Sequence, residues 1–275
     1  MRKFIQILTL ILLYSCTLTG QDRLSFDSEN EFKSELTGSW ILKSYRDSVL
    51  KGCTPFDLQD LLINTHGFFY NPSKRYSYVF PNDSSYWIFI DSKNNFINEG
   101  LAIELDKQVG RIIKKEYSND YDSKTDKWID NYSEPEQIGT FRLIKLDNEV
   151  VLDLKYRDDS VVLVKGDYEK LLNKSFIAGE YKFNNLFTVQ FDTNGHIKNI
   201  EKLDKSFKNI DMYEIGIGYF AEDKDCIYFG QLSSKMKIPF NWTLKHDTLE
   251  LISTMDKSIR YELIKSTPYN NVYTK

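Results

Sequence analysis

Glycine, proline and histidine are scarce in this chain of 275 residues, which contains 13, 6 and 3 of them respectively. The low content of glycine and proline argues against disorder and against a collagen-like repeat. A large excess of charge of either sign is also missing, because the formal net charge is only −4. This balance excludes the basic footprint of a nucleic-acid-binding protein and the acidic tail of a disordered one.

Aromatic residues are abundant instead, with 18 tyrosines and 18 phenylalanines. The hydrophobic share of 41% is ordinary for a globular protein, so a substantial core can form. The length fits one large domain or two ordinary ones. These features indicate a folded, aromatic-rich chain.

The N-terminus resembles an export signal. Arg2 and Lys3 precede an apolar run, Phe4 to Tyr14, that is too short to span a bilayer. Leu13-Tyr14-Ser15-Cys16 then resembles a bacterial lipobox, in which the cysteine carries the lipid; cleavage after Gly20 is the alternative. We therefore expect a signal peptide over residues 1–20 and a protein exported to the periplasm, or anchored to a membrane if Cys16 is modified.

The body of the chain favours strands. Residues 21–35 read as a tether with a short helix, in which Ser28 and Glu31 form a capping-box pair. Thr54 and Asp57 predict a second helix start. Beyond it, apolar residues alternate with a period of two and turn residues separate the runs, which predicts successive antiparallel strands. Residues 118–136 read as a long hairpin or loop.

The pattern occurs twice. Three runs with the same spacing of apolar residues end each half, at residues 141–165 and at residues 242–265. This repeat predicts two tandem, all-β, up-and-down barrel-like modules of about eight strands each. We place the first module at residues 36–166 and the second at residues 176–266, with short helices before and between strands.

The combination of Gly38-x-Trp40 after a short helix with a meander of about eight strands resembles the lipocalin (calycin) pattern. More narrowly, it is similar to lipocalin-like modules in exported proteins of Bacteroidetes. The resemblance implies that Trp40 is buried at a barrel end, beneath a basic side chain from a late strand, and Arg142 is the expected partner, with Lys165 as the alternative. In the second half, Tyr181 replaces the tryptophan and Trp242 belongs to the same packing.

Candidate chemical sites are few. Cys53 and Cys226 form a possible disulfide, or they are two buried thiols. The three histidines are scattered singly and predict no metal site. Asp120-x-Asp122-x-Lys124-x-Asp126 alternates oxygens as a calcium loop does but lacks the central glycine and the bidentate glutamate. We interpret it as a solvated hairpin tip.

The sequence therefore predicts a non-enzymatic protein of the cell envelope without cofactor or metal. Its lipocalin-like modules would bind a small apolar ligand or a protein partner, and no nucleic acid. The alternative is a structural or immunity-type lipoprotein, in which filled barrels act only as scaffolds. An enzyme is the third and least favoured interpretation.

Overall fold

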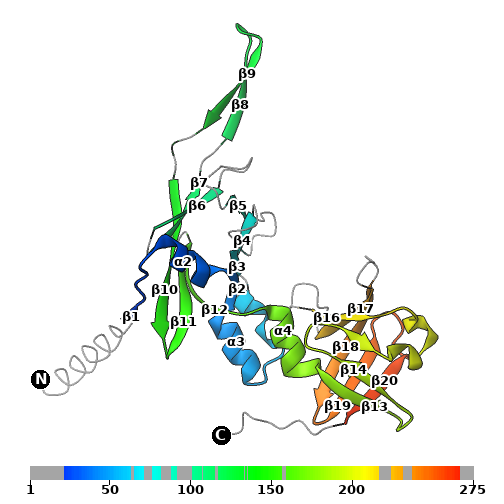
Figure 1. Cartoon of the computed structure of the whole chain (residues 1–275). Coiled ribbons are helices and arrows are strands. Elements are labelled where there is room, and N and C mark those ends of the chain that lie inside the picture. The colour runs from blue at the N-terminus through cyan, green and yellow to red at the C-terminus, as the bar shows by residue number, and fades with distance from the viewer. Residues whose placement is uncertain are drawn as a thin grey trace, which may run out of the picture. The chain divides into compact units, whose positions relative to one another are not determined.

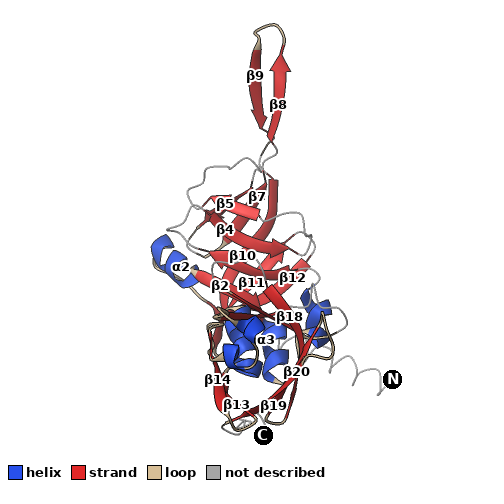
Figure 2. Cartoon of the chain, turned by 90° about the vertical axis from the view of Figure 1, so that its right-hand side faces the viewer, coloured by secondary structure: helices blue, strands red, loops and turns tan. Residues whose placement is uncertain are grey.

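The computed structural model describes residues 22–62, 65–70, 76–81, 88–91, 101–106, 108–114, 117–132, 134, 136–156, 159–216, 224–231 and 237–266. Strands dominate and the helices are short (Figures 1 and 2). The chain forms two compact units, one with residues up to Trp40 and Gly67–Lys165, the other with Ile41–His66 and the residues from Gly166 onward. The predicted all-β architecture with two modules is confirmed.

The first sheet has the strand order β1-β10-β11-β12-β2-β3-β4-β5-β6-β7. The bounds are β1 Asp22–Arg23, β2 Gly38–Leu42, β3 Thr65–Tyr70, β4 Tyr76–Pro81, β5 Ile88–Asp91, β6 Leu101–Leu105, β7 Gly110–Lys114, β10 Glu136–Leu146, β11 Glu149–Tyr156 and β12 Asp159–Lys165. β10 pairs with β11 along one edge and with β7 along the other. The sheet therefore curves so that β7, the last strand in this order, lies beside β10. At this seam Gly110 lies opposite Phe141, whose ring occupies the space that a side chain at Gly110 would need.

A hairpin of β8 (Tyr117–Asp122) and β9 (Lys127–Tyr132) forms a sheet of its own, between β7 and β10 in the chain. Its register places Tyr121 opposite Trp128, so this segment forms the hairpin that was one of the two predicted alternatives. At the tip, Asp122 accepts hydrogen bonds from the Lys124 N–H and the Thr125 hydroxyl, at 2.9 and 2.7 Å. The aspartate thus stabilises its own turn, in line with the interpretation as a solvated hairpin tip.

The second sheet has eight strands in the order β15-β14-β13-β20-β19-β18-β17-β16. The bounds are β13 Gly179–Phe183, β14 Phe187–Phe191, β15 Ile197–Lys198, β16 Met212–Ile215, β17 Cys226–Gly230, β18 Lys237–Lys245, β19 Thr248–Ser253 and β20 Arg260–Lys265. A single bridge between His196 and Met212 joins the two outer strands, which makes the barrel nearly closed. In both sheets the first strand of the module lies beside the last one, β2 beside β12 and β13 beside β20.

Short helices lie before and between the strands. They are α2 Glu29–Leu36, α3 Lys43–Leu50, η2 Phe56–Leu62, α4 Tyr168–Leu172, the π-helical turn η3 Asn173–Ile177, and the 3-10 turns η4 Ile200–Lys202 and η5 Lys205–Phe207. Of these, α2 precedes β2, and α4 with η3 precedes β13. The Ser28 hydroxyl accepts the Glu31 N–H at 3.2 Å, which confirms the predicted helix start. Thr54 and Asp57 likewise bond to each other at the start of η2.

Residues 41–66 pack with the second unit, although the expected boundary at residue 36 assigned them to the first. The reason is local, because β2 ends at Leu42 and the chain turns into α3 rather than continuing as a strand to Arg46. The Leu42 N–H donates to the Tyr168 hydroxyl at 3.0 Å, and the Tyr45 ring meets the Tyr168 ring edge-on. Tyr45 and Val49 are buried there.

Candidate functional site

Trp40 is buried, with 1% of its surface exposed. Its indole N–H donates to the Leu36 carbonyl at 2.8 Å, which ties the first strand to the helix that precedes it. The cation over its ring is Lys165, whose Nζ lies 5.5 Å from the ring centroid. Such a contact stabilises the ammonium against the electron-rich face of the indole.

The expectation that Arg142 covers Trp40 is wrong. Arg142 lies directly opposite Asp153 on the neighbouring strand β11, and its guanidinium bonds that carboxylate at 2.7 and 2.8 Å. This charge-assisted pair holds the arginine on β10, which is three strands away from β2 in the sheet order. Lys165 ends β12, the immediate neighbour of β2, and therefore reaches the ring.

The second module repeats this arrangement. Lys265 Nζ lies 5.6 Å from the ring centroid of Tyr181, which is fully buried. Gly179, with φ +151, occupies the position that Gly38, with φ +120, has in the first module. A side chain at Gly179 would come within 2.7 Å of the Lys265 side chain, so glycine leaves room for the lysine.

The residues before these glycines match as well. Thr37 has φ −59 and ψ 132, and Ala178 has φ −56 and ψ 132, so the helix leads into the strand in the same way twice. The lysines occupy equivalent places in Leu163-Val164-Lys165 and Leu263-Ile264-Lys265. This second lysine is a residue that the sequence reasoning missed, and the shared pattern at the end of both modules was the signal for it.

Trp242 on β18 is buried beside the π-helical turn, where its ring lies 5.5 Å from that of Phe176. Its indole N–H has no hydrogen-bond partner in the described part of the chain. Its position serves packing between the helical link and the barrel. It is not covered by either lysine named above.

Aromatic side chains of the second barrel contact one another in a continuous series. Phe207, from the turn η5, enters from one end and has no exposed surface. Its ring lies 5.6 to 5.7 Å from three rings of the barrel wall, those of Phe229, Phe240 and Tyr261. From Phe229 the contacts continue through Phe191 to Tyr181 at the other end.

Cys53 is half-buried and Cys226 is buried. The Cys226 thiol donates to the side-chain oxygen of Asn241 at 3.3 Å. Cys226 begins β17 and faces packed neighbours, which agrees with the alternative of a buried thiol. No disulfide is formed between them in the structure.

Asp225 joins residues 41–66 to the second barrel. Its carboxylate accepts the backbone N–H of Phe56 at 2.8 Å and a bond from the Thr54 hydroxyl, and its backbone carbonyl accepts the backbone N–H of Trp242 at 3.0 Å. Burial raises the pKa of Asp225, bonds from Thr54 and Phe56 lower it in part, and the charge of Asp57 raises it further. By accepting these hydrogen bonds, the Asp225 carboxylate connects two segments of the chain.

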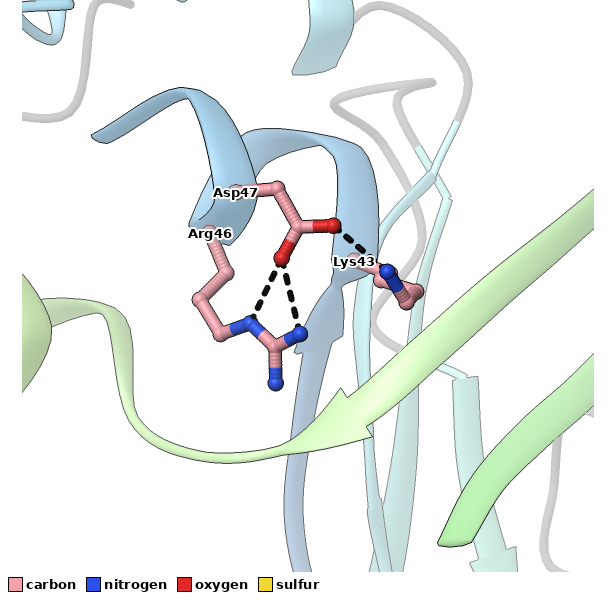
Figure 3. A network of polar contacts seen from close by, with 3 residues as sticks. All are labelled: Lys43, Arg46 and Asp47. Carbon is pink, nitrogen blue, oxygen red and sulfur yellow. Dashed lines mark hydrogen bonds and ion pairs between the residues drawn. The ribbon is translucent and has the colours of Figure 1, made fainter. Parts of the chain in front are cut away.

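A second polar network lies on α3, where Lys43 and Arg46 both bond the Asp47 carboxylate (Figure 3). The Lys43 bond measures 2.6 Å and the shorter Arg46 bond 2.7 Å. Burial by itself would raise the pKa of Asp47, but the bonds from these two cations bring it below its ordinary value. All three residues lie on one helix, so the network stabilises the helix surface.

The remaining candidates do not assemble into a reactive centre. His196 and His246 are exposed, and the side chain of His66 lies outside the described residues. The described part of the chain holds no group of three or more metal-ligating side chains. None of the helices described is long and apolar enough to cross a membrane. Cys16 and the expected signal peptide, residues 1–20, also lie outside the described residues.

No family model, no curated protein and no solved structure matches this chain.

Proposed function

We propose that this chain is a non-enzymatic protein of the cell envelope, whose lipocalin-like modules are rigid scaffolds that present their loops to a protein partner. The observation that carries the proposal is the continuous aromatic packing inside the second barrel, from Phe207 to Tyr181. A carrier of small apolar ligands needs an interior that its own side chains leave open. A filled barrel favours the scaffold interpretation over the ligand carrier.

The non-enzymatic part of the proposal rests on how the ionisable groups are used. Asp225 is half-buried and has a raised pKa, which is common for catalytic acids. Its oxygens nevertheless accept bonds from Phe56 and Thr54 and thereby stabilise the fold. Cys226, the buried thiol next to it, donates to an amide oxygen rather than to a base.

The envelope location is supported by the N-terminal sequence alone. A basic start, an apolar run and the lipobox-like Leu13-Tyr14-Ser15-Cys16 favour export and lipid attachment. Residues 21–35 would then form the tether between the anchor and the first module. The scaffold would work at a membrane surface, within reach of other envelope proteins.

The scaffold proposal is tested by opening the second barrel. Phe207→Ala removes a ring that three neighbouring rings surround, so it should leave a dry cavity that accepts a small aromatic probe such as indole. Leu186→Ala, which truncates an apolar side chain of the same unit that is 77% exposed and so leaves no cavity, is the control. We expect indole binding by NMR titration for Phe207→Ala only.

One result would contradict the scaffold proposal. The unaltered chain could bind a fluorescent fatty acid saturably and in a one-to-one ratio. If Phe207→Ala does not change that binding, the fatty acid binds at a site other than the space around Phe207. The protein would then be a ligand carrier. Far-UV circular dichroism shows whether each variant is folded before its binding is compared.

A further inference from the structure

Three connections of the second barrel meet at one of its ends. These are the β13–β14 turn, the β19–β20 loop and the segment of η4 and η5, and together they are named the loop end, residues 183–187, 254–260 and 200–208. β13 and β20 are antiparallel, so the end of β13 lies beside the start of β20, and the rings of Phe183 and Tyr261 are 6.3 Å apart. Phe207 contacts Tyr261 at 5.7 Å and brings η5 to the same end (Figure 1).

Apolar side chains project from the loop end into solvent. Leu186 is 77% exposed, Met255 is 84% exposed and Ile259 is 40% exposed. Their backbones are fixed, because the Leu186 N–H donates to the Phe183 carbonyl at 2.9 Å and the Met255 N–H donates to the Ser253 hydroxyl at 3.3 Å. Because the side chains of Leu186 and Met255 stay in water, they bury little apolar surface and do not stabilise the fold.

The loop end also carries exposed lysines. Lys202, Lys205 and Lys208 follow one another at intervals of three residues along η4 and η5, and all three are exposed. None of them forms an ion pair with a residue that the structure describes. Exposed lysines also occur beside the two tips, at Lys182 and Lys257.

The loop end has fewer carboxylates than lysines, and two of these carboxylates accept hydrogen bonds from their own turns. Asp204 accepts the Ser206 N–H at 2.7 Å, and Asp256 accepts the Ser258 N–H at 2.9 Å, so both cap their own turns. Glu201 is the third carboxylate of these segments. The three segments hold four lysines against three carboxylates, and they also contain Arg260, which pairs with Glu250 and Glu262. This end is therefore locally basic in a chain whose net charge is −4.

We propose that the loop end docks on an anionic lipid bilayer, with Leu186 and Met255 inserted at the boundary between head groups and acyl chains. Apolar tips on an end that also carries cations fit such a surface, since the tips enter the hydrocarbon and the lysines meet lipid phosphates. At this one end of the second barrel a protein partner fits less well, because lysine is depleted in protein–protein interfaces; the partner of the proposed scaffold would meet other loops. This inference does not depend on the proposed scaffold function.

Vesicle flotation tests it. The chain from Gln21 onward keeps every described residue and lacks the lipid-attachment cysteine, so any binding belongs to the folded part. It should float with vesicles of equal parts phosphatidylglycerol and phosphatidylcholine, and much less with phosphatidylcholine alone. Replacing both tips, as Leu186→Asn with Met255→Gln, should weaken partitioning at least about tenfold.

The charge variant Lys202→Gln, Lys205→Gln and Lys208→Gln should remove the preference for anionic vesicles and its dependence on salt. Leu61→Asn, an apolar residue of similar kind that is 42% exposed on η2, is the matched control and should float normally. Absence of flotation for the unaltered chain, or equal flotation of all variants, would overturn the proposal. Dimerisation that only the tip variant abolishes, without flotation, would assign the loop end to a second copy of the chain.

Discussion

Trp40 and Lys165 provide a quantitative test of how the first module is closed. The indole is 1% exposed, donates to the Leu36 carbonyl at 2.8 Å and lies beneath Lys165 Nζ at 5.5 Å. Trp40→Ala removes the packing, the hydrogen bond and the cation contact together. Trp40→Phe removes mainly the N–H donor, and Lys165→Met removes only the charge.

The expected effects on the free energy of unfolding follow in that order. Truncation of a buried aromatic ring to alanine costs about 3–5 kcal/mol. Loss of the donor leaves the Leu36 carbonyl unpaired in a buried position, which costs about 1–3 kcal/mol. The Lys165 ammonium is 47% exposed at the side chain, so its contact with the ring contributes about 0.5–1 kcal/mol.

A double-mutant cycle of Trp40→Leu with Lys165→Met, followed by guanidinium unfolding, measures that contact directly. Lys165 Nζ also lies 3.8 Å from Glu35, so Glu35→Gln serves as the control that removes the ion pair and keeps the ring contact. A coupling energy near zero, or a loss below about 1 kcal/mol for Trp40→Ala, would refute this account of the barrel end.

Further predictions concern the second unit and the N-terminus. For the thiols, the half-buried Cys53 should react with maleimide faster than Cys226 in the folded chain, and denaturant should expose both; two unreactive sulfurs would reveal a disulfide. Because burial raises the pKa of Asp225, the folded state retains this proton at a pH where the unfolded chain has lost it. Stability should therefore fall as pH rises from about 3.9, the ordinary carboxyl value, through the raised pKa of the folded state, and Asp225→Asn should flatten the fall in melting temperature. For the anchor, Cys16→Ser should move the protein from the membrane to the soluble fraction and abolish labelling by a clickable fatty acid, and unchanged fractionation would exclude lipidation.

Period-two alternation and the repeated closing meander were enough to predict the two all-β modules, because both are local properties of the sequence. The helix start at Ser28 was predictable for the same reason, since its bond to Glu31 spans only three residues. The burial of Trp40 followed from the resemblance. Its cationic partner did not, because the choice between Arg142 and Lys165 depends on which strand lies beside β2.

Long-range packing explains the other differences. After β15 the chain does not continue as a strand, because Asn199 adopts a left-handed conformation with φ 63 and the chain turns into η4. Phe207 lies in η5, and the strand β16 starts only at Met212. The ring of Phe207 belongs to a short turn and not to a strand with a period of two, so its packing inside the barrel could not be predicted from the sequence.

The central claim is that the second barrel is filled and supports loops rather than carrying a ligand. Native mass spectrometry of the protein purified from cell envelopes, followed by organic extraction, tests it most directly. The account predicts the mass of the polypeptide, with its lipid anchor if Cys16 is modified, and no further apolar molecule in stoichiometric amount. A tightly held apolar molecule in a one-to-one ratio, released only when the second unit unfolds, would contradict it.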